Sequence, residues 1–382
     1  MKKTQILLNA HLIAQQFFEG APWVRPNLPL RLQAEQPSQL GGKLMTPRLR
    51  FQRLQSSGLL FAGVALLFAT SAFAAARAQK QNLNMSAAPS TPRLVGYLFA
   101  PKGVNLADSI KTLDLSRITD LDLAFGDPPK CDGTCTAQSD MAFSVKGQMD
   151  ADLDAVIAAA HAAGVKVFLS IGGGGGDQLI IQFYNAGLSA PLVASLDRYI
   201  RVHHFDGVDV DIEDPANMGQ PYANFVSLLS LNMHAEGKLV TGAVAKYLQA
   251  SMPGLALHQF DFINLMNYSS YADAVAALQF YAQEENVPRD RIVLGVPFFA
   301  SNAGDSKEED YNTILAAYPN AWKVNIVGGG ALDDGQGFYY VGEDTMAQEA
   351  QLGKQYGGIM VWHLLGDAPA PHSLLKVIEN NL

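Results

Sequence analysis

The sequence predicts an α/β fold, a single (β/α)8 TIM barrel with a small insertion before its eighth strand. From residue 93 onward, short β-branched or apolar runs alternate with segments of helical periodicity, which is typical of parallel βα units. The runs number eight, the strand count of this barrel. A chain of 382 residues has room for one such barrel and an N-terminal extension.

The N-terminal region has the features of a secretory signal peptide. Three arginines precede an apolar run over 58–76, which ends in two Ala-x-Ala motifs. The arginines are Arg48, Arg50 and Arg53, and the motifs are 72–74 and 76–78. A retained membrane anchor is the alternative, because the run is nearly long enough to span a bilayer. The small residues favour cleavage, so we expect a secreted or periplasmic protein with no stable membrane partner after processing.

Four segments follow from this interpretation. Met45 would be a natural start, since the basic residues follow it at once, and residues 1–44 are then a non-native or misassigned extension. The signal peptide covers 45–78. A linker rich in Gln, Asn, Ser and Pro covers 79–92, and the barrel domain covers 93–382.

Charge is distributed unevenly along the chain. Residues 1–80 hold ten of the 27 Lys/Arg and two of the 36 Asp/Glu, which leaves 17 basic and 34 acidic residues and a formal charge near −17 in the remainder. Such a field repels phosphate backbones and anionic lipid surfaces. We therefore expect no nucleic-acid partner, and a neutral substrate fits this charge better.

The predicted strands and helices alternate along most of the barrel domain. The strands are Leu94–Phe99, Ile118–Phe125, Val165–Ile171, Gly207–Glu213, Leu239–Ala245, Phe262–Asn267, Ile292–Phe298 and Gly358–His363. The helical segments, which can cover the outside of the barrel, are 149–163, 190–203, 219–235, 272–285, 344–356 and 371–381. The connection from Ala300 to Gly357 is the longest and holds extra residues around 322–340, which we expect to wall a cleft.

The chain has two cysteines, Cys131 and Cys135, in a Gly/Pro/Asp-rich stretch of the second crossover. Two thiols alone make a poor zinc site. In an oxidising compartment they can close a small loop, so we expect a local disulfide.

The fourth predicted strand carries a ladder of carboxylates. Because side chains alternate along a strand, Asp209, Asp211 and Glu213 point to one face. Like charges held close together in a low dielectric raise at least one pKa, which provides a protonated acid near neutral pH. A cation site is the alternative, but a calcium loop needs turn-forming residues and a glycine, whereas Val and Ile stand between these acids. We therefore predict catalysis without a metal ion.

This pattern resembles the signature of the family 18 glycoside hydrolases, which include chitinases and some endo-β-N-acetylglucosaminidases. It reads Asp206-x-x-Asp209-x-Asp211-x-Glu213. The resemblance extends over about 93–367, and the other matching motifs are Leu94–Tyr97, Ser170–Gly173, Met266–Tyr268 and Gly358–Trp362. It implies that 93–382 is a glycoside hydrolase domain acting on N-acetylglucosamine-containing glycans.

The resemblance also implies a mechanism that needs no cofactor. Members of the family use the N-acetyl group of the substrate as the nucleophile, an exception to the scheme with two catalytic carboxylates. By this likeness Glu213 protonates the leaving oxygen and then activates water, and the anomeric configuration is retained. Asp211 would orient the acetamide N–H, and Tyr268 would donate to the acetamide oxygen.

Further residues take supporting roles by the same resemblance. Asp209 would lie deeper in the barrel, share a proton with Asp211, and be held by Tyr97 and Ser170. Trp362 would form an apolar floor under the sugar. The expected substrate-binding residues are Trp362, Tyr97, Ser170, Gly172, Gly173, Met266 and Ser269. Without the family match, the aromatic residues would be read as barrel core.

Two positions depart from the family pattern. Ser269 follows the tyrosine where many chitinases carry Asp, and Asp214 follows the proposed acid where an aromatic residue is frequent. The glycine run 172–176 lacks both the last glycine of a dinucleotide motif and a Walker lysine, so it favours a close sugar approach over a phosphate cradle. The sequence thus predicts hydrolysis of chitin or chito-oligosaccharides. An endo-β-N-acetylglucosaminidase and a non-catalytic sugar-binding protein remain as alternatives.

Overall fold

The computed structural model describes residues 91–382 except 175, 219–220, 249–250, 303–306 and 329–336. The predicted extension 1–44, the signal peptide 45–78 and nearly all of the linker 79–92 therefore lie outside the described residues. Within the described part of the chain, no helix is long and apolar enough to cross a membrane.

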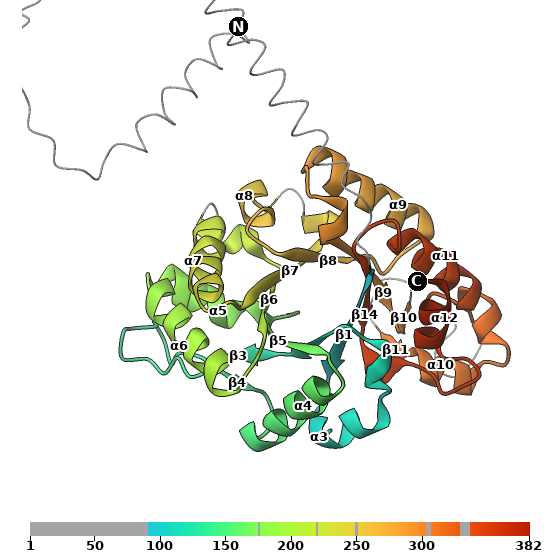
Figure 1. Ribbon diagram of the computed structural model, residues 1–382, viewed down its shortest axis with the longest axis horizontal. Helices are drawn as coiled ribbons and strands as arrows, with labels where there is room; N and C mark the ends of the chain where they lie inside the picture. The colour runs from blue at the N-terminus through green and yellow to red at the C-terminus, as the bar shows by residue number, and fades with distance from the viewer. Residues whose placement is uncertain (1–90, 175, 219–220, 249–250, 303–306, 329–336) are drawn as a thin grey trace, which may run out of the picture. The chain divides into compact units, whose positions relative to one another are not determined.

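Eight parallel strands close into a barrel, which confirms the predicted fold. Figure 1 shows the strands at the centre with the helices around them. The strands are β1 (Arg93–Phe99), β2 (Asp120–Ala124), β5 (Lys166–Gly172), β6 (Gly207–Asp211), β7 (Leu239–Ala245), β8 (Phe262–Met266), β9 (Ile292–Pro297) and β14 (Gly358–Trp362). Their order around the barrel is β1-β14-β9-β8-β7-β6-β5-β2.

One strand boundary matters for function. The predicted fourth strand ran to Glu213, but β6 ends at Asp211. Glu213 therefore stands beyond the carboxyl end of the strand, in the loop that leads to a short 3-10 turn over Pro215–Asn217. Carboxyl ends of barrel strands are where enzymes of this architecture place their chemistry.

Helices on the outside of the barrel match the predicted segments closely. They are α4 (Asp150–Ala162), α6 (Ser189–Val202), α7 (Pro221–Ala235), α9 (Tyr271–Gln279), α11 (Glu343–Gly353) and α12 (Leu374–Asn381). A π-helical turn over Phe280–Glu284 continues α9. The last helix starts three residues later than predicted because the Ser373 hydroxyl caps it, accepting the Lys376 N–H at 3.1 Å.

The sequence analysis missed four helices. Three of them are short: α3 (Leu106–Ser109), α8 (Gly254–Leu257) and α10 (Tyr311–Ala317). The fourth, α5 (Asp177–Asn185), follows the glycine run directly. Because glycine is a poor helix former, the run masks the apolar periodicity that begins at Ile180.

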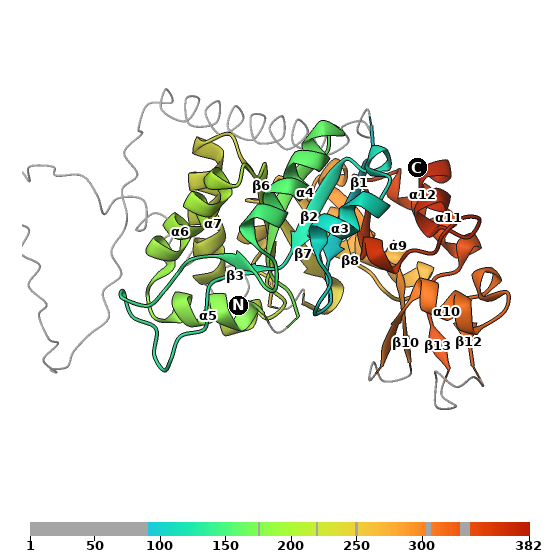
Figure 2. The same ribbon diagram turned by 90° about the horizontal axis from the view of Figure 1, so that it is seen from below.

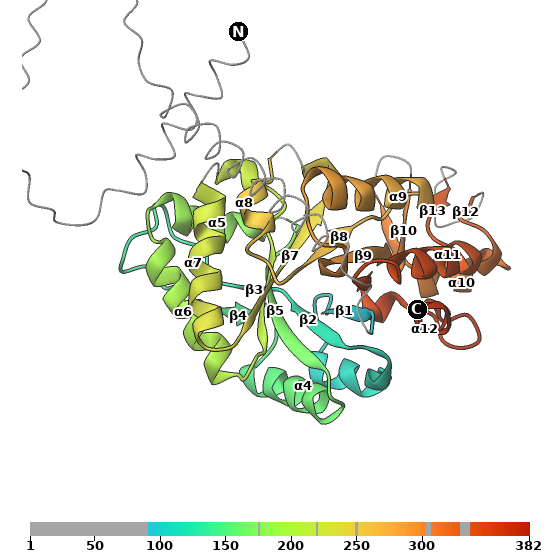
Figure 3. The same cartoon turned by 45° about the horizontal axis from the view of Figure 1, so that its top comes forward.

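Two additions extend the barrel at its loops. After β9, the predicted insertion folds into a four-stranded antiparallel sheet with the order β11-β10-β13-β12. Its strands are β10 (Phe299–Asn302), β11 (Glu308–Asp310), β12 (Ile326–Val327) and β13 (Phe338–Tyr339). Figures 2 and 3 show β10, β12 and β13 side by side next to the barrel.

The second addition is a hairpin after β2, formed by β3 (Gly126–Asp127) and β4 (Ser144–Val145). The loop between these two strands contains a disulfide that joins Cys131 to Cys135, with an S–S distance of 2.10 Å. The second crossover therefore contains both the predicted polar loop and this covalent link.

Apolar packing takes two forms in the barrel. The outward faces of the strands pack against the helices in one continuous cluster. Inside the barrel a small second cluster includes Val95, Phe168 and Phe262. Next to it lie buried polar side chains of β2, β6, β7 and β8, and these form the base of the site described below.

Candidate active site

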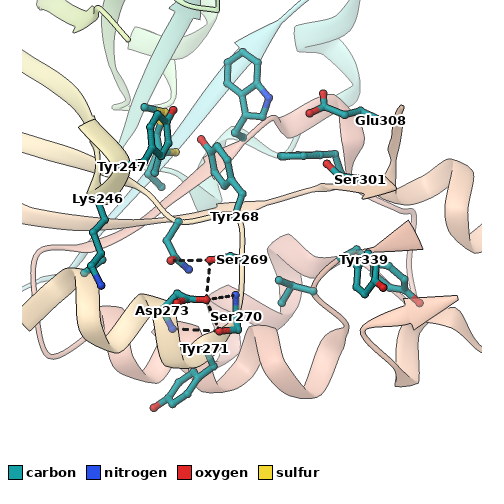
Figure 4. A pocket seen from close by; sticks show the side chains of 18 of the residues that line it. Lys246, Tyr247, Tyr268, Ser269, Ser270, Tyr271, Asp273, Ser301, Glu308 and Tyr339 are labelled. Carbon is teal, nitrogen blue, oxygen red and sulfur yellow. Dashed lines mark hydrogen bonds between the residues drawn. The ribbon is translucent and has the colours of Figure 1, made fainter. Parts of the chain in front are cut away.

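A cavity of about 1580 Å³ opens at the carboxyl ends of the barrel strands. Its lining includes Asp211, Glu213, Tyr268 and Trp362, which come from or directly follow three different strands. The antiparallel sheet of the insertion supplies part of the wall through Ile326, and further lining residues from it are Asn325, Tyr339 and Tyr340. The insertion thus forms one side of the cavity (Figure 4).

Asp209 is the deepest member of the carboxylate ladder and is fully buried. Its Oδ2 accepts hydrogen bonds from Tyr97 Oη at 2.6 Å and Ser170 Oγ at 2.8 Å. Its Oδ1 accepts from Thr241 Oγ1 at 2.7 Å and Asn264 Nδ2 at 3.3 Å. Burial raises the pKa of Asp209, while these hydrogen bonds oppose that rise.

Asp211 lies one step closer to the cavity and has a different environment. It is 4% exposed, and its Oδ1 has no hydrogen-bond partner among the described residues. Burial raises its pKa well above the usual range, and the charges of Glu213, Asp209 and Asp177 add to the rise. Both oxygens of Asp209 accept hydrogen bonds from other donors, and the sharing of a proton between Asp209 and Asp211 stays a prediction.

The sequence analysis missed a further buried acid, Asp122 on β2. It is 1% exposed, and its Oδ2 accepts a hydrogen bond from Asn264 Nδ2 at 3.2 Å. Burial raises its pKa well above the usual range, and the charges of Asp209 and Asp120 add to this. The period-two argument applied to β6 would have found it, since Asp120 and Asp122 alternate with leucines in the same way.

Glu213 stands at the mouth of the cavity, half-buried, where solvent and substrate can reach it. Its Oε2 accepts a hydrogen bond from Tyr247 Oη at 3.3 Å. Burial raises the pKa of Glu213, the hydrogen bond from Tyr247 lowers it, and the charge of Asp177 raises it. The net direction is upward, so the acid form persists to higher pH than in an ordinary glutamate.

Tyr247 and Asp177 were both absent from the predicted site. Tyr247 lies in the 3-10 turn Lys246–Leu248 after β7, and no family motif marked that loop. Asp177 stands directly after the glycine run 172–176, at the position where the last glycine of a dinucleotide motif is missing. Their nearness to Glu213 depends on how neighbouring barrel loops meet, which the sequence does not reveal.

Tyr268 follows β8 and lines the cavity together with Asp211 and Glu213. Burial raises its pKa well above the usual range, and the charges of Asp211 and Glu213 add to the rise. Its hydroxyl therefore keeps its proton and can donate a hydrogen bond. The ring packs edge to face on Phe299 of β10, with ring centroids 5.4 Å apart. Figure 4 shows Tyr268 and Tyr247 close together at this part of the cavity.

Trp362 ends β14 and belongs to an aromatic cluster. Its ring centroid lies 5.5 Å from those of Tyr97 and Phe99, and 5.6 Å from that of Phe125, which stacks at an interplanar angle of 24°. Phe125 also lines the cavity and was missed by the sequence analysis. The cluster fixes the orientation of the indole at the base of the cavity.

The glycine run serves packing more than ligand contact. Gly172 has φ +101°, and a Cβ there would lie 2.4 Å from the Asp211 carbonyl oxygen. Gly173 has φ +74°, and a Cβ there would lie 2.4 Å from the Phe125 ring. Neither lines the cavity, whereas Gly174 does. Gly172 and Gly173 therefore allow the loop after β5 to approach β6, and their contact with substrate stays a prediction.

The remaining predicted substrate-binding residues fall into two groups. Met266 and Ser269 line the cavity together with Tyr97, whereas Ser170 is buried beneath it. Ser269 Oγ lies 3.2 Å from Asp273 Oδ2. A carboxylate is thus held next to the position where many family members carry Asp, but it comes from the first turn of α9 (Figure 4).

Among the described residues, no group of three or more His, Cys, Asp or Glu side chains is arranged to hold a metal ion. The cavity lining itself offers acids, tyrosines and aromatic rings. Glu213, with a raised pKa, is half-buried on the cavity wall. Asp211 is buried, and Tyr268 lines the same cavity.

Comparison with known proteins places this geometry in a family. Residues 93–367 match the profile of Glycosyl hydrolases family 18. A chitinase-like effector of Moniliophthora perniciosa is 34% identical over 107 residues, which cover 28% of this chain and 23% of that protein. Exochitinase 1 of Streptomyces olivaceoviridis is 33% identical over 132 residues, 31% of this chain and 20% of that protein. The matched segments thus span about a fifth of the length of these relatives.

Solved structures agree over a larger part of the chain. A GH18 chitinase from the chitin utilization locus of Flavobacterium johnsoniae superposes with a TM-score of 0.64 and 25% identity, covering 76% of this chain and 94% of that one. A chitinase from Bacteroides thetaiotaomicron superposes with a TM-score of 0.62 and 22% sequence identity, and the match covers 76% of this chain and 96% of that one. A chitinase-like agglutinin from Robinia pseudoacacia superposes with a TM-score of 0.58 and 19% sequence identity, and the match covers 75% of this chain and 98% of that one.

Proposed function

Because the chain belongs to family 18 of the glycosyl hydrolases, we propose that it hydrolyses β-1,4 glycosidic bonds in N-acetylglucosamine-containing glycans, namely chitin or chito-oligosaccharides. The premise rests on the profile match over residues 93–367. The named relatives and the structural neighbours that act on chitin support the choice of substrate. The negative charge of the barrel domain fits a neutral sugar.

The observation that carries the proposal is that Glu213, Asp211 and Tyr268 line one cavity, with Glu213 half-buried and Asp211 buried. A general acid must hold a proton at the working pH and must reach the leaving oxygen. The raised pKa of Glu213 meets the first need, and its half-buried position on the cavity wall meets the second. Three residues in one cavity thus supply a proton donor, a buried carboxyl oxygen that can accept a hydrogen bond, and a hydroxyl donor.

The proposed reaction proceeds in two steps. In the first, Glu213 gives its proton to the glycosidic oxygen while the acetamide carbonyl oxygen of the substrate bonds to the anomeric carbon. The C–O bond to the leaving sugar breaks, and a cyclic oxazolinium ion forms. In the second step the Glu213 carboxylate takes a proton from water, which attacks the anomeric carbon from the side the leaving group vacated. The bond between this carbon and the acetamide oxygen breaks, so the oxazolinium ring opens and the acetamide is restored. Two inversions give net retention.

Asp211 and Tyr268 stabilise the bound acetamide in this scheme. The unpaired Oδ1 of Asp211 would accept the acetamide N–H, which would satisfy a buried oxygen that has no partner among the described residues. The Tyr268 hydroxyl would donate to the acetamide oxygen. Positive charge that develops on the oxazolinium ion favours the ionised form of Asp211, and the Asp211 carboxylate then offsets this charge. Trp362 would provide the apolar surface under the pyranose ring.

The direct test is hydrolysis of chito-oligosaccharides by the wild-type protein and by the Glu213→Gln variant. We expect the wild type to release products with retained anomeric configuration, seen by NMR before mutarotation. The variant should lose turnover while keeping its oligosaccharide affinity in calorimetry, because Gln fills the same space without an ionisable proton. Turnover retained by Glu213→Gln would overturn the assignment of this residue.

Two other functions share the same site. An endo-β-N-acetylglucosaminidase would cleave the chitobiose core of N-linked glycans with the same residues, and a high-mannose glycoprotein tested beside chitin oligomers separates the two. A sugar-binding protein without activity is the second alternative, because a chitinase-like effector and a chitinase-like agglutinin are among the similar proteins. Sugar binding with no hydrolysis of either substrate would favour it.

Export completes the proposal. The arginines and the apolar run over 58–76 support a cleaved signal peptide and an extracellular or periplasmic location. Mass spectrometry of protein recovered outside the cytoplasm should find an N-terminus after one of the Ala-x-Ala motifs. Protein retained in the membrane fraction with this run intact would favour an anchor.

A further inference from the structure

The two-residue segment that ends in Glu213 is held at both sides by the loop after β5. On one side, the Gly173 N–H donates to the Asp211 carbonyl oxygen at 2.8 Å. On the other side, the Asp214 N–H donates to Asp177 Oδ2 at 3.0 Å. Residues 212 and 213 therefore lie between two hydrogen bonds to the same neighbouring loop.

Asp177 is built into the structure rather than free on the surface. It is 3% exposed and forms the first residue of α5. Its Oδ1 accepts a long hydrogen bond from Gln178 Nε2 at 3.5 Å. An isolated buried carboxylate is costly, so a position that keeps one must offer it donors. The backbone N–H that follows Glu213 is the donor offered to Oδ2.

The loop that carries Asp177 is itself fixed from the opposite side. Asp127 of β3 accepts the Gly172 N–H through Oδ1 at 3.2 Å. A Cβ at Gly176 would lie 2.2 Å from the Gly172 carbonyl oxygen and 3.0 Å from Asp127 Oδ2, so only glycine fits there. The loop after β5 is thus held between the loops after β2 and β6. Because the loop is fixed on both sides, a displacement of Asp177 is expected to displace Glu213 as well.

We propose that Asp177 is a positioning residue for the reaction: its carboxylate holds the turn that carries Glu213 and places a negative charge beside the Glu213 carboxyl. This inference rests on the proposed function of Glu213 as the acid. It assigns a role to a residue that touches neither the substrate nor the reacting atoms. Asp177 lies outside the segments that resemble family motifs, of which Ser170–Gly173 and Asp206–Glu213 are the nearest.

The charge of Asp177 acts within a defined set of groups. Around Glu213, the charge of Asp177 raises the pKa and the hydroxyl of Tyr247 lowers it, while burial has the largest effect. The acids that interact with Asp177 are Asp214, Asp127 and Asp211. Removing the negative charge at 177 should therefore lower the pKa of Glu213.

Two substitutions separate the hydrogen bond from the charge. Asp177→Asn keeps an oxygen that can accept the Asp214 N–H but removes the charge. Asp177→Ala removes both. The matched control is Asp214→Asn, which also neutralises an acid next to Glu213. The Asp214 side chain instead accepts a hydrogen bond from Asn217 Nδ2.

Kinetics on a chito-oligosaccharide give the first test. For Asp177→Asn we expect the basic limb of the kcat/KM profile to move to lower pH, with kcat little changed at acid pH. For Asp177→Ala we expect kcat to fall by about 10²-fold with KM nearly unchanged, because misplacing a catalytic group by an ångström costs about this much. The control should match the wild type in both respects. An unchanged profile in Asp177→Asn, or the same shift in Asp214→Asn, would overturn the proposal.

Two readouts do not depend on hydrolysis. Hydrogen exchange should speed up over residues 211–214 in Asp177→Ala but stay near wild type in Asp177→Asn. A carbon NMR titration of the labelled Glu213 carboxyl should show the lower pKa directly in Asp177→Asn. If the wild type hydrolyses nothing while these two effects appear, the proposed function fails and the positioning role stands. If Asp177→Ala does not fold, the test rests on Asp177→Asn alone. A Glu213 pKa equal to that of the wild type in Asp177→Asn would then overturn the proposed effect of the Asp177 charge.

Discussion

Glu349 on α11 is expected to make the stability of this protein fall as the pH rises. Its side chain is fully buried, and neither carboxyl oxygen has a hydrogen-bond partner among the described residues. The helix packs against α12 and β9, so water is excluded from this position. Burial raises the pKa of Glu349 to about 8, far above the ordinary value of 4.5.

The size and sign of the effect follow from this pKa. Between pH 4.5 and about 8, the folded protein keeps a proton on Glu349 that the unfolded chain has released. The folded state then binds more protons, so the free energy of unfolding decreases with rising pH. A pKa difference of about 3.5 corresponds to about 5 kcal/mol at 1.36 kcal/mol for each pH unit. The contribution is fully present below pH 4.5 and lost above about pH 8.

Replacing Glu349 by Met removes the carboxyl at similar volume. Urea unfolding of both proteins at several values between pH 4 and pH 9 gives the free energy of unfolding at each. We expect the advantage of Glu349→Met to grow by several kcal/mol from pH 4 to pH 9. The control is Glu284→Met, which replaces an exposed carboxyl on the π-helical turn and so reports the effect of the same substitution without burial. If the free energy of unfolding of the wild type and of Glu349→Met changed in parallel with pH, the reasoning would be refuted.

Three further predictions concern the site. Asp211→Asn should lower kcat by at least about 10²-fold on chito-oligosaccharides, because it removes the carboxyl group that stabilises the oxazolinium ion. An unchanged kcat would count against catalysis assisted by the substrate acetamide. Tyr247→Phe removes a hydrogen bond that lowers the pKa of Glu213, so the basic limb of the kcat/KM profile should move to higher pH, opposite to the effect of Asp177→Asn. Gly173→Ala should destabilise the fold by about 2 to 4 kcal/mol in urea unfolding, since the added Cβ meets the Phe125 ring at a positive φ; a loss below 1 kcal/mol would contradict this.

Local patterns predicted the barrel and the carboxylate ladder well. Each barrel strand is marked by a short local pattern of residues, either an alternation with a period of two or a continuous apolar run. The existence of these strands and their order along the chain could therefore be predicted from the sequence. The same logic oriented Asp209 and Asp211 correctly and placed both in the barrel interior. The error at Glu213 was small in sequence but important in chemistry, because ending β6 two residues earlier moves this side chain to the cavity mouth.

Contacts between loops were beyond the reach of the sequence. Tyr247 meets Glu213 across 34 positions of the chain, and Asp177 meets the Asp214 N–H across 37. Neither residue type nor local spacing marks such pairs, since they arise only when neighbouring barrel loops are brought together. The antiparallel sheet of the insertion escaped prediction for a related reason, because its strands are two to four residues long and pair out of sequence order.

The polar network beneath the cavity has a consequence for proton counting. Asn264 Nδ2 lies within 3.3 Å of three oxygens, on Tyr97, Asp122 and Asp209. An amide nitrogen carries two hydrogens, so it cannot serve all three at once. The Tyr97 proton is already given to Asp209. The Asp122 carboxyl therefore depends on this shared amide for its hydrogen bond, while burial and the charge of Asp209 raise its pKa well above the usual range. Folding of the barrel thus favours the neutral form of Asp122 more than the unfolded chain does, so this layer of the barrel links folding to proton uptake.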